Sequence, residues 1–267
     1  MNQKRFHKIC NLIENLDKSL KQFDLENFKI IEKRSLMSFT LKFFIVHGVG
    51  LGVNTIFMLI SLAPGNPLWM IAIRTRAISL NILRLMSTQF MFYCDYLTSR
   101  FVIFNKECEK IIKTSDQFGT EIEILQKIQL LKALDLKMMT LLHCFQKYFK
   151  TMLMLNITAD VVAIVIAIYW IYGGLTYGNP FELQSDLVPC AKMIALYLVF
   201  HSGSSLLAER RKTATYIYLI KSKSLKFAVI KRHFLLQKLH TDGEVFEFHG
   251  NGFFYVNFQT LVGVKSV

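Results

Sequence analysis

Two polar residues, Asn156 and Asp160, interrupt an apolar stretch at residues 152–172. They are four positions apart, so in a helix they lie on the same face. A charged side chain in hydrocarbon costs on the order of 3 kcal/mol and normally turns toward a bundle interior or a wet cavity. Asn156 and Asp160 are therefore predicted to line a ligand pocket or an ion path. The alternative is a structural role, in which Asp160 pairs with Arg84 or Arg76 of an earlier helix.

Two further candidates are an arginine inside an apolar stretch and a tryptophan at the end of one. Arg74 lies within the stretch at 68–100, and Trp170 follows Tyr169 at the end of the stretch at 152–172. The Tyr-Trp pair is typical of the aromatic belt at a membrane interface, with a pocket wall as the alternative. The candidate ligand-binding residues are thus Asn156, Asp160, Trp170 and Arg74.

No pattern in the sequence indicates catalysis, a metal or a cofactor. The seven histidines show no metal-ligand spacing with each other or with cysteine. Gly48, Gly50 and Gly52 resemble a dinucleotide fingerprint, but they lie inside an apolar stretch with no preceding strand. Gly48 and Gly52 are four apart, and close helix packing is the better interpretation. An enzyme is not expected.

The amino-acid composition indicates that the candidate residues lie in membrane helices. Of the 267 residues, 52% are hydrophobic, 23 are Phe and only 19% are charged. The mean hydropathy is +0.34, which is too apolar for one aqueous domain. Stretches long enough to cross a bilayer as helices lie at 41–63, 68–100, 152–172 and 187–207. The stretch at 68–100 contains several arginines and Asp95, so a simple hydropathy window identifies it as a membrane helix less clearly than the other three.

The basic residues alternate with these stretches and predict their orientation. Segments 1–40, 100–150 and 208–242 hold eight, nine and nine of the 32 Lys and Arg, whereas the loops at 64–67 and 173–186 hold none. This positive-inside pattern predicts four membrane helices with a cytoplasmic N-terminus. A nucleic-acid-binding protein has no reason to alternate its basic residues with apolar stretches. We therefore expect the apolar surface to contact the lipid bilayer, and we expect no nucleic-acid partner.

The segments between the stretches are predicted to extend the membrane helices. Apolar residues recur at helical spacing in 121–139 and 213–239, with lysines between them. We expect an all-α membrane protein, a multi-pass transmembrane helical bundle with inner amphipathic helical extensions that pack on each other. The cytoplasmic parts are 1–40, 101–150 and 208–242, and 243–267 begins a final helix. The alternative places the amphipathic helices flat on an anionic inner leaflet.

Several short motifs, in this order, resemble a known family. Residues 100–105 read RFVIFN, the helix with Asn156 ends in Tyr169-Trp170, and an inner run at 234–237 reads FLLQ. The most specific is FHGNGFFYVN at 248–257, which is similar to a Gly-Phe-Phe-x-Ile/Val-Asp/Asn entry to a last helix. Together they resemble the insect gustatory receptors, seven-helix ligand-gated cation channels related to the insect odorant receptors.

The resemblance implies a taste chemoreceptor at the plasma membrane of a sensory neuron. Its ligand would be a small-molecule tastant, and its subunits would form homo- or hetero-tetramers with a seventh helix lining the pore. The four stretches would correspond to helices three to six. The sequence shows no counterpart of the first two and ends at Val267, before the Thr-Tyr-x-x-x-x-x-Gln-Phe signature of the pore helix, so we expect an incomplete or nonconducting member. The alternatives are a small multi-pass transporter and a nonconducting membrane scaffold.

Overall fold

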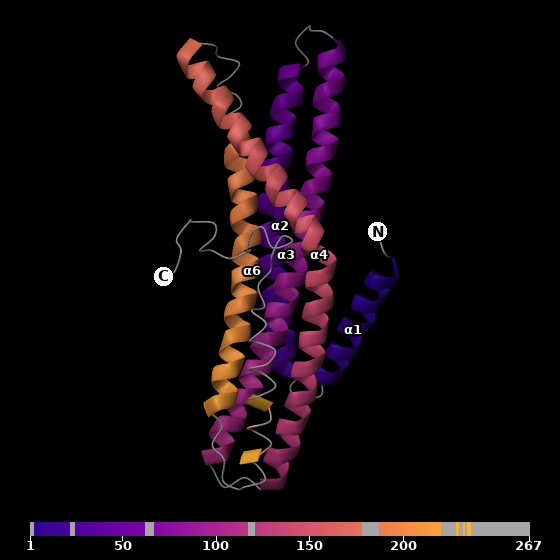
Figure 1. Cartoon of the computed structure of the whole chain (residues 1–267), viewed down its shortest axis with the longest axis vertical. Coiled ribbons are helices and arrows are strands. Elements are labelled where there is room, and N and C mark those ends of the chain that lie inside the picture. The colour runs from indigo at the N-terminus through magenta and orange to yellow at the C-terminus, as the bar shows by residue number, and fades with distance from the viewer. Residues whose placement is uncertain are drawn as a thin grey trace. The chain divides into compact units, whose positions relative to one another are not determined.

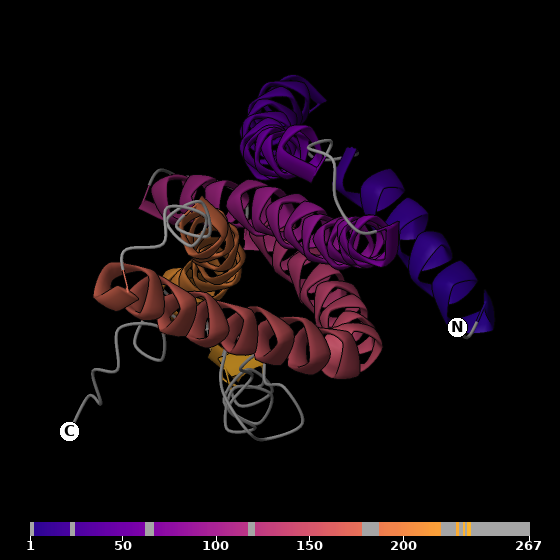
Figure 2. The same ribbon diagram turned by 90° about the horizontal axis from the view of Figure 1, so that it is seen from above.

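Long helices make up the chain in its computed structural model (Figure 1). The structure describes residues 3–21, 25–61, 67–116, 121–177, 187–219, 228–229, 232 and 234–235. Within these ranges there is no strand, as a second view also shows (Figure 2). The five helices are α1 (Gln3–Lys21), α2 (Leu25–Ser61), α3 (Pro67–Asp116), α4 (Glu121–Tyr177) and α6 (Leu187–Leu219). The prediction of an all-α protein is confirmed.

Four of these helices are longer than a membrane crossing requires. A bilayer core needs about 20 residues of helix, whereas α2, α3, α4 and α6 have 37, 50, 57 and 33 residues. Each has room for a crossing and an extension. The membrane-spanning stretches predicted at 68–100, 152–172 and 187–207 lie within α3, α4 and α6, and the one at 41–63 lies in α2 up to Ser61.

Three helical segments of the described chain are long and apolar enough to cross a membrane. They are Phe28–Gly52, Gln126–Gly173 and Pro189–Leu219. No segment of α3 is among them. The side chains of residues 67–81 lie outside the described residues, so the crossing of α3 stays a prediction.

The chain divides into two compact units, each built from parts of the same helices. We call them the Arg100 unit (residues 1–36, 94–149 and 203–248) and the Asp160 unit (residues 37–93, 150–202 and 249–267). The boundaries fall inside α2, α3, α4 and α6, so each of these helices contributes one segment to each unit.

The Arg100 unit has an ordinary apolar core. Ile128, Leu131, Leu134 and Met138 of α4 are all buried, as the amphipathic pattern at 121–139 predicts. They share the core with Leu16 and Leu20 of α1, Phe101 and Phe104 of α3, and Phe145 and Phe149 of α4. Helices packed around a common core agree with the prediction of mutually packed extensions rather than separate surface helices. The helix expected at 213–239 is described to Leu219 and in isolated residues beyond it, and 243–267 lies outside the described residues.

A buried arginine ties three helices of this unit together. Arg100 of α3 is only 1% exposed. Its Nε and Nη2 donate to Asp17 of α1 at 2.9 and 3.0 Å, and Nη2 also donates to Glu32 of α2 at 3.2 Å. The guanidinium lies over the rings of Phe28 and Tyr96, 4.7 and 4.1 Å from their centroids. This two-pronged arginine-carboxylate contact fixes α1 on the unit.

A polar contact also joins α3 and α6 within the Arg100 unit. The Asn105 amide donates to the Glu209 carbonyl at 2.9 Å, and the Thr213 hydroxyl donates to Asn105 Oδ1 at 2.8 Å. Asn105 and Thr213 are both buried. Because a buried amide needs partners for both its nitrogen and its oxygen, these bonds fix the register of the two helices.

Candidate ligand-binding site

In the Asp160 unit, the usual arrangement of polar and apolar side chains is reversed. Along α4, Asn156 and Asp160 are buried, whereas Val165 and Ile168 are more than half exposed. Exposed β-branched residues suit lipid, and charges in a membrane helix normally face the bundle interior. The polar face of α4 is thus the face covered by its neighbours.

An ion pair from two helices forms the centre of this polar region. The Lys192 ammonium of α6 donates to Asp160 Oδ1 of α4. Asp160 is 6% exposed and Lys192 is 4% exposed. Arg84 of α3, also buried, attracts the same carboxylate electrostatically. Pairing of Asp160 with an arginine was one expectation, but its hydrogen-bond donor is Lys192, and the side chain of Arg76 lies outside the described residues.

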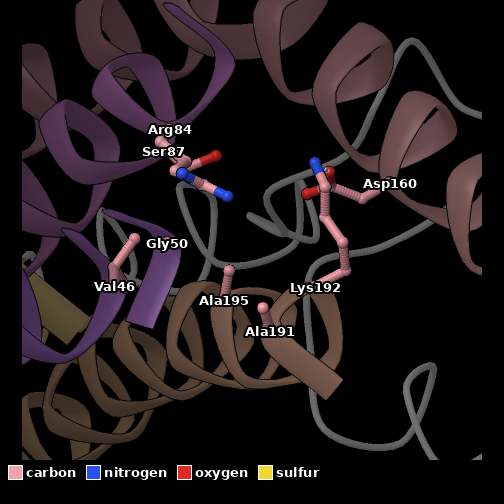
Figure 3. Close-up of a pocket in the computed structure, with 8 residues that line it drawn as sticks. All are labelled: Val46, Gly50, Arg84, Ser87, Asp160, Ala191, Lys192 and Ala195. Atoms are coloured by element: carbon pink, nitrogen blue, oxygen red, sulfur yellow. Dashed lines mark hydrogen bonds and ion pairs between the residues drawn. The ribbon is translucent and has the colours of Figure 1, made fainter. Parts of the chain in front are cut away.

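These three charged side chains line a small cavity (Figure 3). The lining comes from four helices and consists of Val46 and Gly50 of α2, Arg84 and Ser87 of α3, Asp160 of α4, and Ala191, Lys192 and Ala195 of α6. Figure 3 shows the Arg84 guanidinium and the Lys192-Asp160 pair on opposite sides of the space. The cavity volume is about 10 Å³, which is room for about one water molecule.

The position of Arg84 depends on a glycine. A Cβ added at Gly50 would collide with the Arg84 guanidinium, so only a residue without a side chain leaves the guanidinium in this place. The interpretation of Gly48 and Gly52 as close-packing positions is wrong for the described structure. A Cβ at either would meet no atom within 4 Å. The glycine between them, on a different helix face, makes the close approach.

Polar contacts surround the cavity and fix the helices that form it. The Lys42 ammonium of α2 donates to the Ser202 hydroxyl of α6 at 2.8 Å. His47 Nε2 and the Thr88 hydroxyl, from α2 and α3, are 3.0 Å apart, and that hydroxyl donates to the Arg84 carbonyl at 2.8 Å. Phe39 and Phe92 of α2 and α3 pack edge to face at 4.9 Å. The site thus has a second layer of specific contacts on three of its four helices.

Comparison with known families identifies the class of protein to which this chain belongs. Residues 1–266 match the family described as the 7tm chemosensory receptor. The chain belongs to the 7tm chemosensory receptor family. This confirms the expected relationship to the gustatory and odorant receptors at the level of the family. A comparison with curated proteins found no match.

Family membership gives the receptor a coarse function and a setting. Chemosensory receptors bind small molecules in a membrane context, and the family is not a family of enzymes. The receptor is accordingly a chemoreceptor with membrane-type helices. Among the residues that the structure describes, no three His, Cys, Asp or Glu side chains lie close enough to hold a metal ion.

The four predicted ligand-binding residues of the receptor have different outcomes. Asp160 lines the cavity. Asn156 is buried one turn earlier on α4 but is not among the lining residues. The side chains of Arg74 and Trp170 lie outside the described residues, although the helices that carry them are described.

Sequence reasoning missed Lys192, Ser87 and Gly50 as parts of the receptor's cavity. A signal for Lys192 was present, because it is the one Lys or Arg in the stretch at 187–207, just as Asp160 is the one charge in 152–172. Opposite charges isolated in two apolar helices are expected to pair, since each alone is costly. For Ser87 and Gly50 the sequence carries no such signal.

Proposed function

We propose that this receptor is a taste-type chemoreceptor of the plasma membrane and a subunit of a ligand-gated cation channel. Its ligand is a small-molecule tastant that binds at the cavity lined by Arg84, Asp160 and Lys192. One observation carries the proposal. In a chain of the chemosensory receptor family, three buried charged side chains from three helices face the same small space.

The geometry suggests how binding would be transmitted. Lys192 and Asp160 belong to α6 and α4, and Arg84 belongs to α3. A ligand that hydrogen-bonds to one of these groups competes with the existing ion pair. It therefore changes the relative stability of different arrangements of the three helices, and such a difference is the only way in which a ligand shifts a conformational equilibrium.

Several parts of the proposal rest on the sequence and the resemblance. They are a cytoplasmic N-terminus, the four membrane crossings, assembly into homo- or hetero-tetramers with receptor subunits, and a contribution of Asn156, Arg74 and Trp170 to ligand contact. The alternation of basic and uncharged loops supports the orientation. The burial of Asn156 on the same face as Asp160 supports its place near the site.

The test is ligand-evoked calcium entry in cells that express the receptor, alone and together with a conducting receptor subunit. A tastant panel is applied while surface labelling reports the amount of protein at the plasma membrane. We expect Asp160→Asn to shift the ligand concentration that gives a half-maximal response, a quantity that does not depend on how much of the variant reaches the surface. No response to any compound, with the protein confirmed at the surface in both settings, would contradict channel function. Substrate uptake without current would instead identify a transporter.

A further inference from the structure

More positive than negative side chains are found among the described residues that line the cavity. Arg84 and Lys192 are cationic, Asp160 is anionic, and Ser87 is a neutral hydroxyl. The other four lining residues, Val46, Gly50, Ala191 and Ala195, bring no polar side chain. With their side chains ionised, the lining residues that the structure describes have a formal charge of plus one. A buried site with an excess of one charge is stabilised by a ligand of the opposite charge.

The lining side chains also carry more hydrogen-bond donors than acceptors. A guanidinium offers five N–H donors, an ammonium three and a hydroxyl one, whereas a carboxylate offers two acceptor oxygens. One of the two Asp160 oxygens already accepts from Lys192. Arg84 and Lys192 already have partners in the receptor, and a ligand that supplies acceptor oxygens can replace these partners at both cations, whereas a ligand that supplies donors cannot.

The arginine is in a place where it can meet such a ligand. Its guanidinium reaches into the cavity against Gly50 (Figure 3), and a planar guanidinium binds a carboxylate through two parallel N–H bonds. Lys192, on the opposite side, can exchange one carboxylate partner for another, because its ammonium is a compact charge with rotatable donors.

We propose that the cavity binds the carboxylate group of a small organic acid between Arg84 and Lys192. The proposal rests on the proposed function and names the chemical class of its ligand. The cavity has room for about one water molecule, so the helices that line it move apart to admit even a short acid, whose alkyl group then contacts the small apolar residues of α2 and α6. Long or branched acids require a larger movement.

The experiment uses the purified receptor in lipid nanodiscs and follows its thermal unfolding against ligand concentration. The probe is sodium propionate, and the matched controls are propionamide, propylamine and sodium chloride at equal concentration. A ligand that binds only the folded state raises the unfolding midpoint in a saturable way. We expect a saturable rise with propionate and none with the amide, the amine or chloride.

Variants connect the effect to the cavity. Arg84→Gln removes the cation, and we expect it to weaken the apparent propionate affinity at least tenfold. Lys113→Gln removes a cation at an exposed position of the same helix, and it should leave the affinity unchanged. If Arg84→Gln does not fold, Gly50→Ala displaces the guanidinium instead and should also weaken binding. Gly48→Ala adds the same methyl group in open space and should not.

The other outcomes would overturn the proposal in distinguishable ways. Equal stabilisation by propionamide would show that charge is irrelevant, and stabilisation by propylamine alone would make Asp160 the charge that binds the ligand. An equal effect of chloride would reduce the site to a general anion site. No effect of any probe would remove organic acids as ligands. The proposed function survives all four results, since it fails only if no tastant of any class evokes calcium entry.

Discussion

Both units of the receptor bury charged side chains, but the surroundings of these charges differ. In the Arg100 unit, the Arg100 guanidinium meets two carboxylates and two aromatic rings. In the Asp160 unit, a single carboxylate meets an ammonium and a guanidinium, and all three line an open space. The first arrangement is satisfied by the protein itself. The second lies at a small cavity, where we propose that a ligand binds.

The surfaces of the two units differ in a matching way. The Arg100 unit surrounds an apolar core with many lysines, as in proteins in water. The Asp160 unit exposes Val, Ile and Phe and buries Lys42, Arg84, Asp160 and Lys192, as expected in lipid. The comparison teaches that a buried charge has to be interpreted with its surroundings. Where its partners and packing are complete it is structural, and where it faces a cavity it is a candidate for binding.

The largest expected effect comes from breaking the Arg100 contact. Arg100→Ala leaves Asp17 and Glu32 without their common partner and removes packing between three helices, so we expect a loss of about 3 kcal/mol of unfolding free energy. Unfolding of the purified receptor in mixed micelles measures this loss. Lys113→Ala, at an exposed ion pair of the same helix, is the control. Equal stability of the two variants would show that Arg100 is not structural.

The next prediction compares two segments of α4, one that we assign to water and one that we assign to lipid. Val165 and Leu136 both lie on α4 and are 60% and 53% exposed, but they belong to different units. A lysine near the middle of a membrane helix costs about 2.5–3.5 kcal/mol of insertion free energy. We expect this cost for Val165→Lys in a reporter of membrane insertion carrying residues 152–172. For Leu136→Lys we expect a change in unfolding free energy within about 0.5 kcal/mol. Equal tolerance of both changes in the full chain would contradict the assignment of the Asp160 unit to lipid.

A double-mutant cycle tests the ion pair at the cavity. Asp160→Asn and Lys192→Gln each remove one charge of the ion pair and leave the other charge buried, whereas the double variant removes both charges. We expect the double variant to be more stable than the sum of the single losses by about 1–3 kcal/mol. The readouts are unfolding free energy and surface expression. Additive losses would mean that the two side chains do not interact in the folded receptor.

The smallest predicted effect separates neighbouring glycines. Gly50→Ala forces the Arg84 guanidinium to move, and this displacement should offset most of the gain of about 1 kcal/mol that alanine brings in helix propensity. Gly48→Ala and Gly52→Ala add a methyl group in open space, and each should stabilise α2 by up to about 1 kcal/mol through higher helix propensity. Thermal unfolding of the three variants gives the order. A loss of stability at Gly48 or Gly52 would point to a neighbouring subunit against this face of α2.

Much of the fold follows from the sequence, because helix formation and burial leave periodic patterns. The spacing at 121–139 predicts the buried face of α4 in the Arg100 unit, and the polar pair Asn156 and Asp160 predicts its buried face in the Asp160 unit. The spacing of residues in one helix gives the face they share. It does not give the rotation of the neighbouring helix that meets this face.

The rest of the site depends on that rotation. Lys192, rather than Arg84, donates to Asp160 because of how α6 is turned toward α4. Likewise, only the packing of α2 and α3 shows that Gly50, and not Gly48 or Gly52, touches Arg84. Asp17 is one of many charged residues in the first 40, and nothing local distinguishes it as the partner of Arg100.

The small residues of the cavity wall have a consequence for how such receptors diverge. Gly50, Ala191 and Ala195 give the cavity its size, and Arg84, Asp160 and Lys192 give it its charge. On the proposed function, the addition of single methyl groups at the first set in one copy of a duplicated gene changes the length of ligand that this copy accepts, while the chemical class of the ligand stays the same. A change in the sign of a charge in the second set changes the chemical class of the ligand and leaves its length the same. The length and the chemical class of the ligand thus depend on separate sets of residues within one fold, and each can change in evolution without the other.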